Sequence, residues 1–123
     1  MEGSYWGAVL RKGILKRVDG LPGEAASTRP RYRIEWDNER VIRARMNRGG
    51  RSMELSELLY HEGKLFGFCD VTGLVWKIRP EDGAVFQRWA IADGDGDQPR
   101  PFKSEWATER DDLIWVGSMG RPF

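Results

Sequence analysis

Apolar and polar side chains alternate with a period of two through most of the chain, in short runs separated by turn-forming residues. Such alternation is typical of β-strands that place one face against a core. No segment sustains the period of about 3.6 residues that marks an amphipathic helix. The pattern predicts strands over residues 6–10, 14–18, 32–36, 41–46, 55–60, 64–68, 74–78, 85–91, 102–108 and 113–116. The expected fold class is therefore all-β.

Turn signals between these runs suggest how the strands connect. Arg11-Lys12-Gly13 predicts a hairpin turn, Asp37-Asn38 predicts a turn between two strands, and the Gly- and Pro-containing residues 19–30 predict a loop. Residues 61–63, 70–73 and 80–83 predict further turns, so the run from Leu58 to Trp89 is expected to form three or four consecutive antiparallel strands. A sandwich, a barrel or propeller blades would all satisfy this spacing.

The predicted run from Leu58 to Trp89 is about the size of one propeller blade. On the same count, the whole chain would hold about two to three blades. Because a closed propeller needs about four or more blades, we expect this chain to be part of a longer protein.

Composition fits one soluble domain, because 40% of the 123 residues are apolar and 32% are charged. The six tryptophans are expected mostly in the core or between packed sheets. Cys69 is the one cysteine, which excludes an internal disulfide and a zinc site built from several cysteines, and its apolar neighbours predict a buried, inert thiol. The chain has no apolar stretch of about 18 residues, and its first residues lack a signal-peptide pattern.

The net charge of +1 hides an asymmetry, since residues 1–52 are basic overall and residues 53–123 are acidic. One basic stretch could attract a polyanion, or it could be the solvated face of a strand. We do not expect nucleic acid as a partner, because no aromatic stacking platform is interleaved with these arginines. The stretch consists of Arg40, Arg43, Arg45, Arg48 and Arg51.

Two acidic features are candidates for metal binding. Asp93-Gly94-Asp95-Gly96-Asp97 alternates carboxylates, as hard cations such as Ca²⁺ prefer, but the EF-hand pattern fails at Gln98 and Ser104. A polar turn between strands is the alternative. Glu105 lies between Phe102 and Trp106, where a carboxylate needs a cation or several hydrogen-bond donors. The lone histidine offers no credible Ser-His-Asp arrangement.

Three stretches, taken together, resemble the calcium-activated nucleotidases of the apyrase family. Residues 51–58 are similar to the family pattern G-R-G-M-E-L-S-[DE]-L, where the first Gly corresponds to Gly50. Residues 63–75 are similar to the family pattern N-G-K-L-Y-x-x-D-D-R-T-G-x-V-Y, beginning at the Gly of that pattern. Residues 93–106 are similar to the family pattern D-G-D-G…F-K-A-E-W. Order and spacing are preserved from about Trp6 to the C-terminus, which makes the joint match far more specific than any one motif.

The resemblance implies that residues 1–123 are a partial domain of a five-bladed β-propeller. It also implies calcium-dependent hydrolysis of nucleoside di- or triphosphates such as UDP and GDP, in a protein that is secreted or lies in the lumen of the endoplasmic reticulum or Golgi. Matched positions suggest calcium ligands at Ser56 and Glu105 and a catalytic acid at Asp70, which would organise the metal's waters or the nucleophile. Basic positions matched to phosphate binding are Arg51, Lys103 and Arg121.

Departures from the family pattern leave two alternatives open. Cys69 replaces an acid and Val71 replaces an arginine, and the family's upstream D-x-D element and its later ligands have no counterpart here. Ca²⁺ takes about six to eight oxygens, whereas this chain offers two matched ligands. The chain could therefore be a non-catalytic propeller fragment, or an all-β module that binds polyanions through its arginines.

Overall fold

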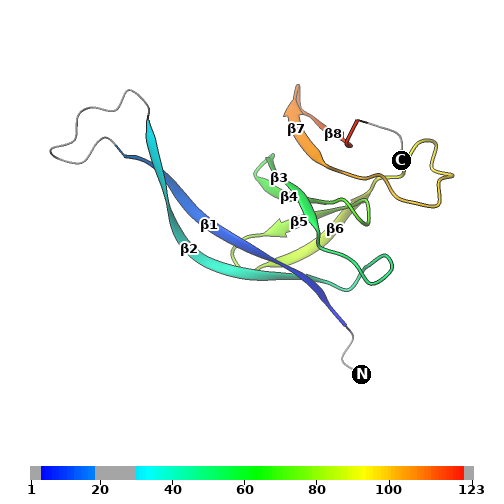
Figure 1. Cartoon of the computed structure of the whole chain (residues 1–123), viewed down its shortest axis with the longest axis horizontal. Coiled ribbons are helices and arrows are strands. Elements are labelled where there is room, and N and C mark those ends of the chain that lie inside the picture. The colour runs from blue at the N-terminus through cyan, green and yellow to red at the C-terminus, as the bar shows by residue number, and fades with distance from the viewer. Residues whose placement is uncertain (1–3, 19–29, 121–123) are drawn as a thin grey trace.

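The computed structural model describes residues 4–18 and 30–120, and their regular elements are all β-strands in three antiparallel sheets (Figure 1). The all-β prediction is therefore confirmed. No helix in this described part is long and apolar enough to cross a membrane. The strands are β1 (Trp6–Val18), β2 (Arg31–Ala44), β3 (Leu55–His61), β4 (Lys64–Cys69), β5 (Leu74–Arg79), β6 (Ala84–Ala90), β7 (Trp106–Arg110) and β8 (Leu113–Gly117).

The strands β3 to β6 form a four-stranded meander, which we call the central sheet. It confirms the consecutive strands predicted between Leu58 and Trp89. The turn from β3 to β4 places Glu62 at φ 46° and Gly63 at φ 73°. Two successive positive φ values are the signature of the tight turn that matches the twist of a hairpin. The turn-forming residues in the sequence therefore predicted the position of this sheet correctly.

The two middle strands, β4 and β5, are buried on both faces of the central sheet, since their consecutive side chains point to opposite sides and most of them are buried. One face contributes Cys69, Trp76 and Ile78 to a cluster with Ile42 and Ala44 of β2. On the other face, a second cluster joins the central sheet to the hairpin of β7 and β8; it contains Phe66, Phe68 and Val75 with Ala107, Ile114 and Val116. The central sheet therefore lies between its two neighbours (Figure 1).

The hairpin predicted at residues 11–13 and the turn predicted at residues 37–38 are wrong, because β1 and β2 each continue through these positions. Between the pairs Arg11↔Glu39 and Gly13↔Trp36, one residue of β1 faces two residues of β2. The turn-forming Asp37 and Asn38 therefore serve in a β-bulge. Glycine suits this place because a Cβ at Gly13 would lie 2.7 Å from Cγ2 of Ile34. The loop expected at 19–30 falls, except for Pro30, outside the described residues.

The expectation that most tryptophans fill the core is also wrong for the described part of the chain, where Trp76 alone is buried. Trp36 is 53% exposed, Trp106 47% and Trp115 54%. These three side chains lie on the two outer sheets, and Trp89, on the edge strand β6 of the central sheet, is 39% exposed. The outer sheets thus present large apolar side chains that are about half exposed.

Candidate functional site

Charged side chains gather at the end of the central sheet where β4 ends and β5 begins. Asp70 is the first residue after β4, and its backbone N–H donates to the carbonyl of Glu54 at 3.2 Å. The N–H of Gly73 donates to the carbonyl of Cys69 at 3.0 Å and closes the turn. These two bonds fix Asp70 beside the segment that leads into β3.

The connection from β6 to β7 folds back over the same turn. Ile91 donates its N–H to the carbonyl of Gly73 at 2.8 Å, and Phe102 donates to the carbonyl of Ile91 at 3.1 Å. The segment at Ile91 lies so close to the turn that a Cβ at Gly73 would be 2.7 Å from the Ile91 oxygen. Lys103 follows directly, which brings its side chain over Asp70.

Lys103 links two carboxylates that come from different parts of the chain. Its Nζ lies 2.8 Å from Oδ2 of Asp70 and also contacts Oε1 of Glu105. The pKa of the Lys103 ammonium is raised above its ordinary value, because the negative charges of its partners favour the protonated form. Asp70 makes the larger contribution and Glu105 the smaller one. The side chains of Asp70, Lys103 and Glu105 are 17%, 26% and 29% exposed. We call Asp70 and Glu105 the carboxylate pair.

Arg51 and Glu54 flank the carboxylate pair. Arg51 donates from Nε to Oε1 of Glu54 at 2.9 Å and from a terminal nitrogen to Oε2 at 2.5 Å. This two-point contact lowers the pKa of Glu54 and raises that of Arg51, and the charge of Asp70 adds to the effect on Arg51. Lys103 likewise contributes to the lowered pKa of Glu54. The five side chains therefore form one electrostatic unit, the site-end cluster.

The structure brings most of the predicted site residues to this end of the sheet. Asp70, Lys103 and Glu105 are in contact, and Arg51 interacts electrostatically with Asp70. Ser56 is exposed in β3, as the extra residue of a bulge between the pairs Leu55↔Cys69 and Glu57↔Phe68. Bulges next to functional sites commonly redirect a side chain. Arg121 lies outside the described residues.

The two departures from the family motif have a structural role here. Cys69 is a free thiol with no exposed surface, which confirms the buried cysteine predicted above. Val71 is also buried, and both side chains belong to the cluster that joins the central sheet to β2. These positions serve the core, while the neighbouring Asp70 faces the charged cluster.

Sequence reasoning missed Glu54, the partner of Arg51. The available signal was a basic and an acidic residue three positions apart, which is weak because such pairs are common on protein surfaces. The acidic loop is confirmed as a polar turn between β6 and β7: Gly96 donates to the carbonyl of Asp93 at 3.0 Å, and Asp97 to the side chain of Asp95 at 3.1 Å.

The donor atoms at the site-end cluster fit part of a calcium site. Carboxylate oxygens are the hard ligands that Ca²⁺ prefers, and Oδ1 of Asp70 is buried without a hydrogen-bond partner. Within residues 4–18 and 30–120, no group of three or more His, Cys, Asp or Glu side chains could hold an ion. The described residues therefore offer two carboxylates that suit Ca²⁺, and not a complete acidic cage.

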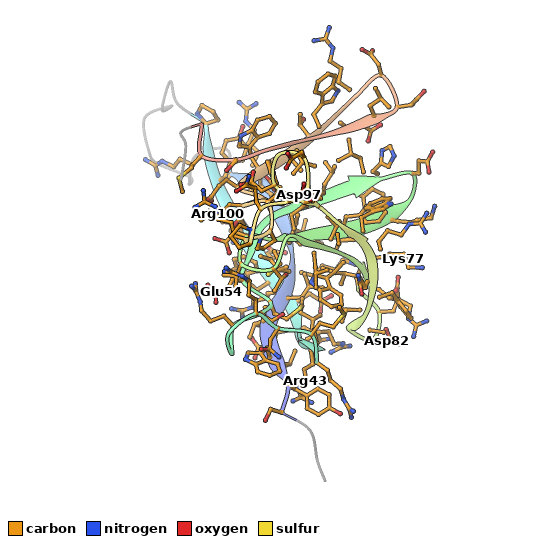
Figure 2. All side chains as sticks on the ribbon, turned by 90° about the vertical axis from the view of Figure 1, so that its right-hand side faces the viewer. Arg43, Glu54, Lys77, Asp82, Asp97 and Arg100 are labelled. Atoms are coloured by element: carbon orange, nitrogen blue, oxygen red, sulfur yellow. The ribbon has the colours of Figure 1, made fainter. Side chains whose placement is uncertain are left out.

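A groove of about 660 Å³ lies at the opposite end of the central sheet, between β1 and the strands β3 to β6. Its walls include Lys12, Tyr60, Lys77 and Phe86. Figure 2 shows the separation, with Glu54 on one side of the molecule and Lys77 and Asp82 on the other. The groove and the site-end cluster are therefore distinct, and the groove contains none of the predicted site residues.

These observations define an all-β protein of stacked antiparallel sheets, with carboxylates and cations gathered at one end of the middle sheet. The sequence model of the apyrase family, described as "Apyrase", matches residues 1–123. The chain belongs to this family.

Similar proteins support the same family. An "Apyrase" from Cimex lectularius is 44% identical over 92 residues, which cover 73% of this chain and 25% of that protein. A "Soluble calcium-activated nucleotidase 1" from Rattus norvegicus is 35% identical over 124 residues, covering 99% of this chain and 28% of that protein. The chain thus spans about a quarter of the length of these curated relatives.

Proposed function

We propose that this chain supplies part of the active centre of a calcium-dependent nucleotidase that hydrolyses nucleoside di- and triphosphates, UDP and GDP among them. The observation that carries the proposal is the convergence of Asp70, Lys103 and Glu105 at one end of the central sheet. Two carboxylates held together by a lysine, in a family with relatives named calcium-activated nucleotidase, are suited to binding a cation and phosphate together.

Each of the predicted site residues has a proposed role. Glu105, Ser56 and Asp70 would hold Ca²⁺, and Asp70 would also orient the water that attacks the phosphate. A bound calcium ion would polarise the phosphoryl oxygens as a Lewis acid. Arg51 presents a planar, permanently charged group that matches two phosphate oxygens, so it would bind and orient the substrate together with Lys103 and Arg121.

We further propose that residues 1–123 are part of a five-bladed β-propeller. Two observations support this architecture: the central sheet has four antiparallel strands, and a neighbouring sheet packs on each of its faces. Exposed apolar side chains on the outer sheets, such as Leu15 at 65% and Trp115 at 54%, suit contact with further blades.

The polyanion-binding alternative has less support. Arg45 donates to the hydroxyl of Tyr5 at 2.5 Å and lies over its ring, and Arg51 is held by Glu54. Arg40 also donates to the backbone carbonyl of Glu39 at 3.2 Å, so three of the five arginines in the basic stretch have partners within the chain. No observation favours this function over the nucleotidase.

Phosphate release from UDP or GDP, measured with Ca²⁺ and with a chelator, tests the proposed function. The assay should use this chain and a version as long as the relatives. In the active version, Asp70→Asn is expected to lower turnover by roughly a hundredfold or more, because water would lose its orienting group. Asp82→Asn, at the opposite end of the sheet, is the matched control and should leave turnover unchanged.

Two results of this assay would contradict the proposal. Turnover that a chelator leaves intact would exclude the calcium chemistry. Equal turnover in Asp70→Asn and wild type would remove Asp70 from the reaction. Activity confined to the longer version would mean that this chain alone is a non-catalytic fragment, which contributes to the site without completing it.

A further inference from the structure

We infer that Lys103 is a built-in counter-cation, whose ammonium holds the carboxylate pair together until a divalent cation displaces it. The inference rests on the cation site of the proposed function and adds a competitor for that site within the chain itself. It predicts that metal affinity is set partly by a residue that is not a metal ligand.

The contacts of Lys103 carry the argument. One nitrogen contacts Oδ2 of Asp70 at 2.8 Å and Oε1 of Glu105, so the two carboxylates lie within a few ångströms of each other. Two carboxylates at such close range repel unless a positive charge lies between them. In this structure that charge is the lysine ammonium.

A calcium ion at the carboxylate pair would need the same oxygens. Because the ion carries twice the charge of an ammonium and binds the oxygens directly, it would repel the Lys103 ammonium from the carboxylate pair. Oδ1 of Asp70 makes no hydrogen bond, so one oxygen of the pair is already available to an incoming ion. Lysine also suits displacement, since its compact charge sits on a flexible four-carbon stem.

Displacement would leave Lys103 with an unpaired ammonium beside the site. Its side chain is 26% exposed, so solvent already reaches it, and Arg51 belongs to the same electrostatic unit. A freed ammonium next to Arg51 would attract an anionic phosphate. Calcium and phosphate would then favour each other's binding, and this coupling must be reciprocal.

A calorimetric titration with Ca²⁺ alone tests the inference without any assay of activity. Lys103→Met removes the competing charge and keeps an unbranched side chain, so Ca²⁺ affinity should rise roughly tenfold, because a charge-assisted bond no longer has to be broken. Lys64→Met is the matched control: Lys64 also pairs with a carboxylate two residues away, Glu62, at 3.8 Å, but at the opposite end of the sheet. Its Ca²⁺ affinity should equal that of wild type.

Lys103→Arg keeps the experiment decisive if Lys103→Met fails to fold. Its guanidinium can hold both carboxylates with several N–H groups, so Ca²⁺ affinity should fall. Equal or weaker binding in Lys103→Met, or unweakened binding in Lys103→Arg, overturns the counter-cation role while the calcium site stands. Absence of Ca²⁺ binding in wild type and in every variant overturns both the inference and the calcium site.

Discussion

The two ends of the central sheet both carry charged pairs, but the pairs are built differently. At the groove end, Arg79 donates to Asp82 at 2.8 and 2.5 Å, within one turn and with both side chains about half exposed. At the site end, Lys103 reaches Asp70 across 33 residues of sequence, and both side chains are mostly buried. A local, solvated pair stabilises its own turn, whereas a distant and partly buried pair exists only because the fold assembles it.

The largest effect that we predict concerns which positions at the site end can carry charge. Cys69→Asp would place a carboxylate with no exposed surface in an apolar cluster, next to the position where Asp70 is tolerated. The free energy of unfolding, measured by urea denaturation, should fall by about 4 kcal/mol. Cys69→Ser is the control and should cost about 1–2 kcal/mol. A Cys69→Asp protein as stable as wild type would mean that this position faces the site.

Two turn glycines sharpen the comparison between the ends. Gly73 at the site end and Gly63 at the groove end have similar φ values of 67° and 73°. A Cβ at Gly73 would lie 2.7 Å from the Ile91 oxygen, whereas a Cβ at Gly63 would point into open space. Gly63→Ala should cost about 1 kcal/mol of unfolding free energy from backbone strain. Gly73→Ala should cost about 2 kcal/mol more, because the backbone above it must move. Equal costs would show that the segment before Lys103 is not tightly docked.

Ser104 tests the packing between two residues of the site-end cluster, Lys103 and Glu105. Its hydroxyl is fully buried and lacks a hydrogen-bond partner. Ser104→Ala should therefore stabilise the protein by about 1 kcal/mol, since removing an unsatisfied buried group recovers part of its desolvation cost. Ser56→Ala, on an exposed serine, is the control and should change little. A less stable Ser104→Ala protein would reveal a partner for that hydroxyl.

The smallest effect is the titration of Asp82 at the groove end. Its pKa falls from 3.8 to about 2, mainly because Arg79 hydrogen-bonds its ionised form, with a smaller contribution from the N–H of Ala84. Because the folded-state pKa is depressed, this stabilisation is present above pH 3.8 and is lost as the pH falls towards 2. Carboxyl NMR shifts should give this pKa, and Arg79→Gln should return it towards 3.8. An unshifted pKa in wild type would contradict the pairing.

The central sheet could be predicted from sequence because its turns use residues with strong local preferences. Glu62-Gly63 and Gly83 adopt the positive φ values of short hairpin turns, and this preference is local to the turn residues. Asp37-Asn38 misled the prediction, since the same residue types also suit a bulge, and only pairing with β1 decides between the two.

The site was predictable only as far as the family motifs reached. The motifs pointed to Asp70, Lys103 and Glu105, but no local pattern specifies that one ammonium contacts both carboxylates. That contact depends on how the segment from Ile91 to Phe102 folds over Gly73, which is a tertiary feature. The partnership of Arg51 with Glu54 was missed for a different reason, because surface pairs of this spacing are too common to be informative.

Calorimetric titration of Glu105→Gln with Ca²⁺ tests the central claim, that Asp70 and Glu105 bind a common cation, most directly. The account predicts an affinity lower than wild type by roughly tenfold or more, because the substitution removes a charged ligand and keeps the side-chain shape. Asp95→Asn, in the exposed acidic turn, should bind Ca²⁺ as wild type does. Unchanged affinity in Glu105→Gln, or a loss confined to Asp95→Asn, would contradict the account.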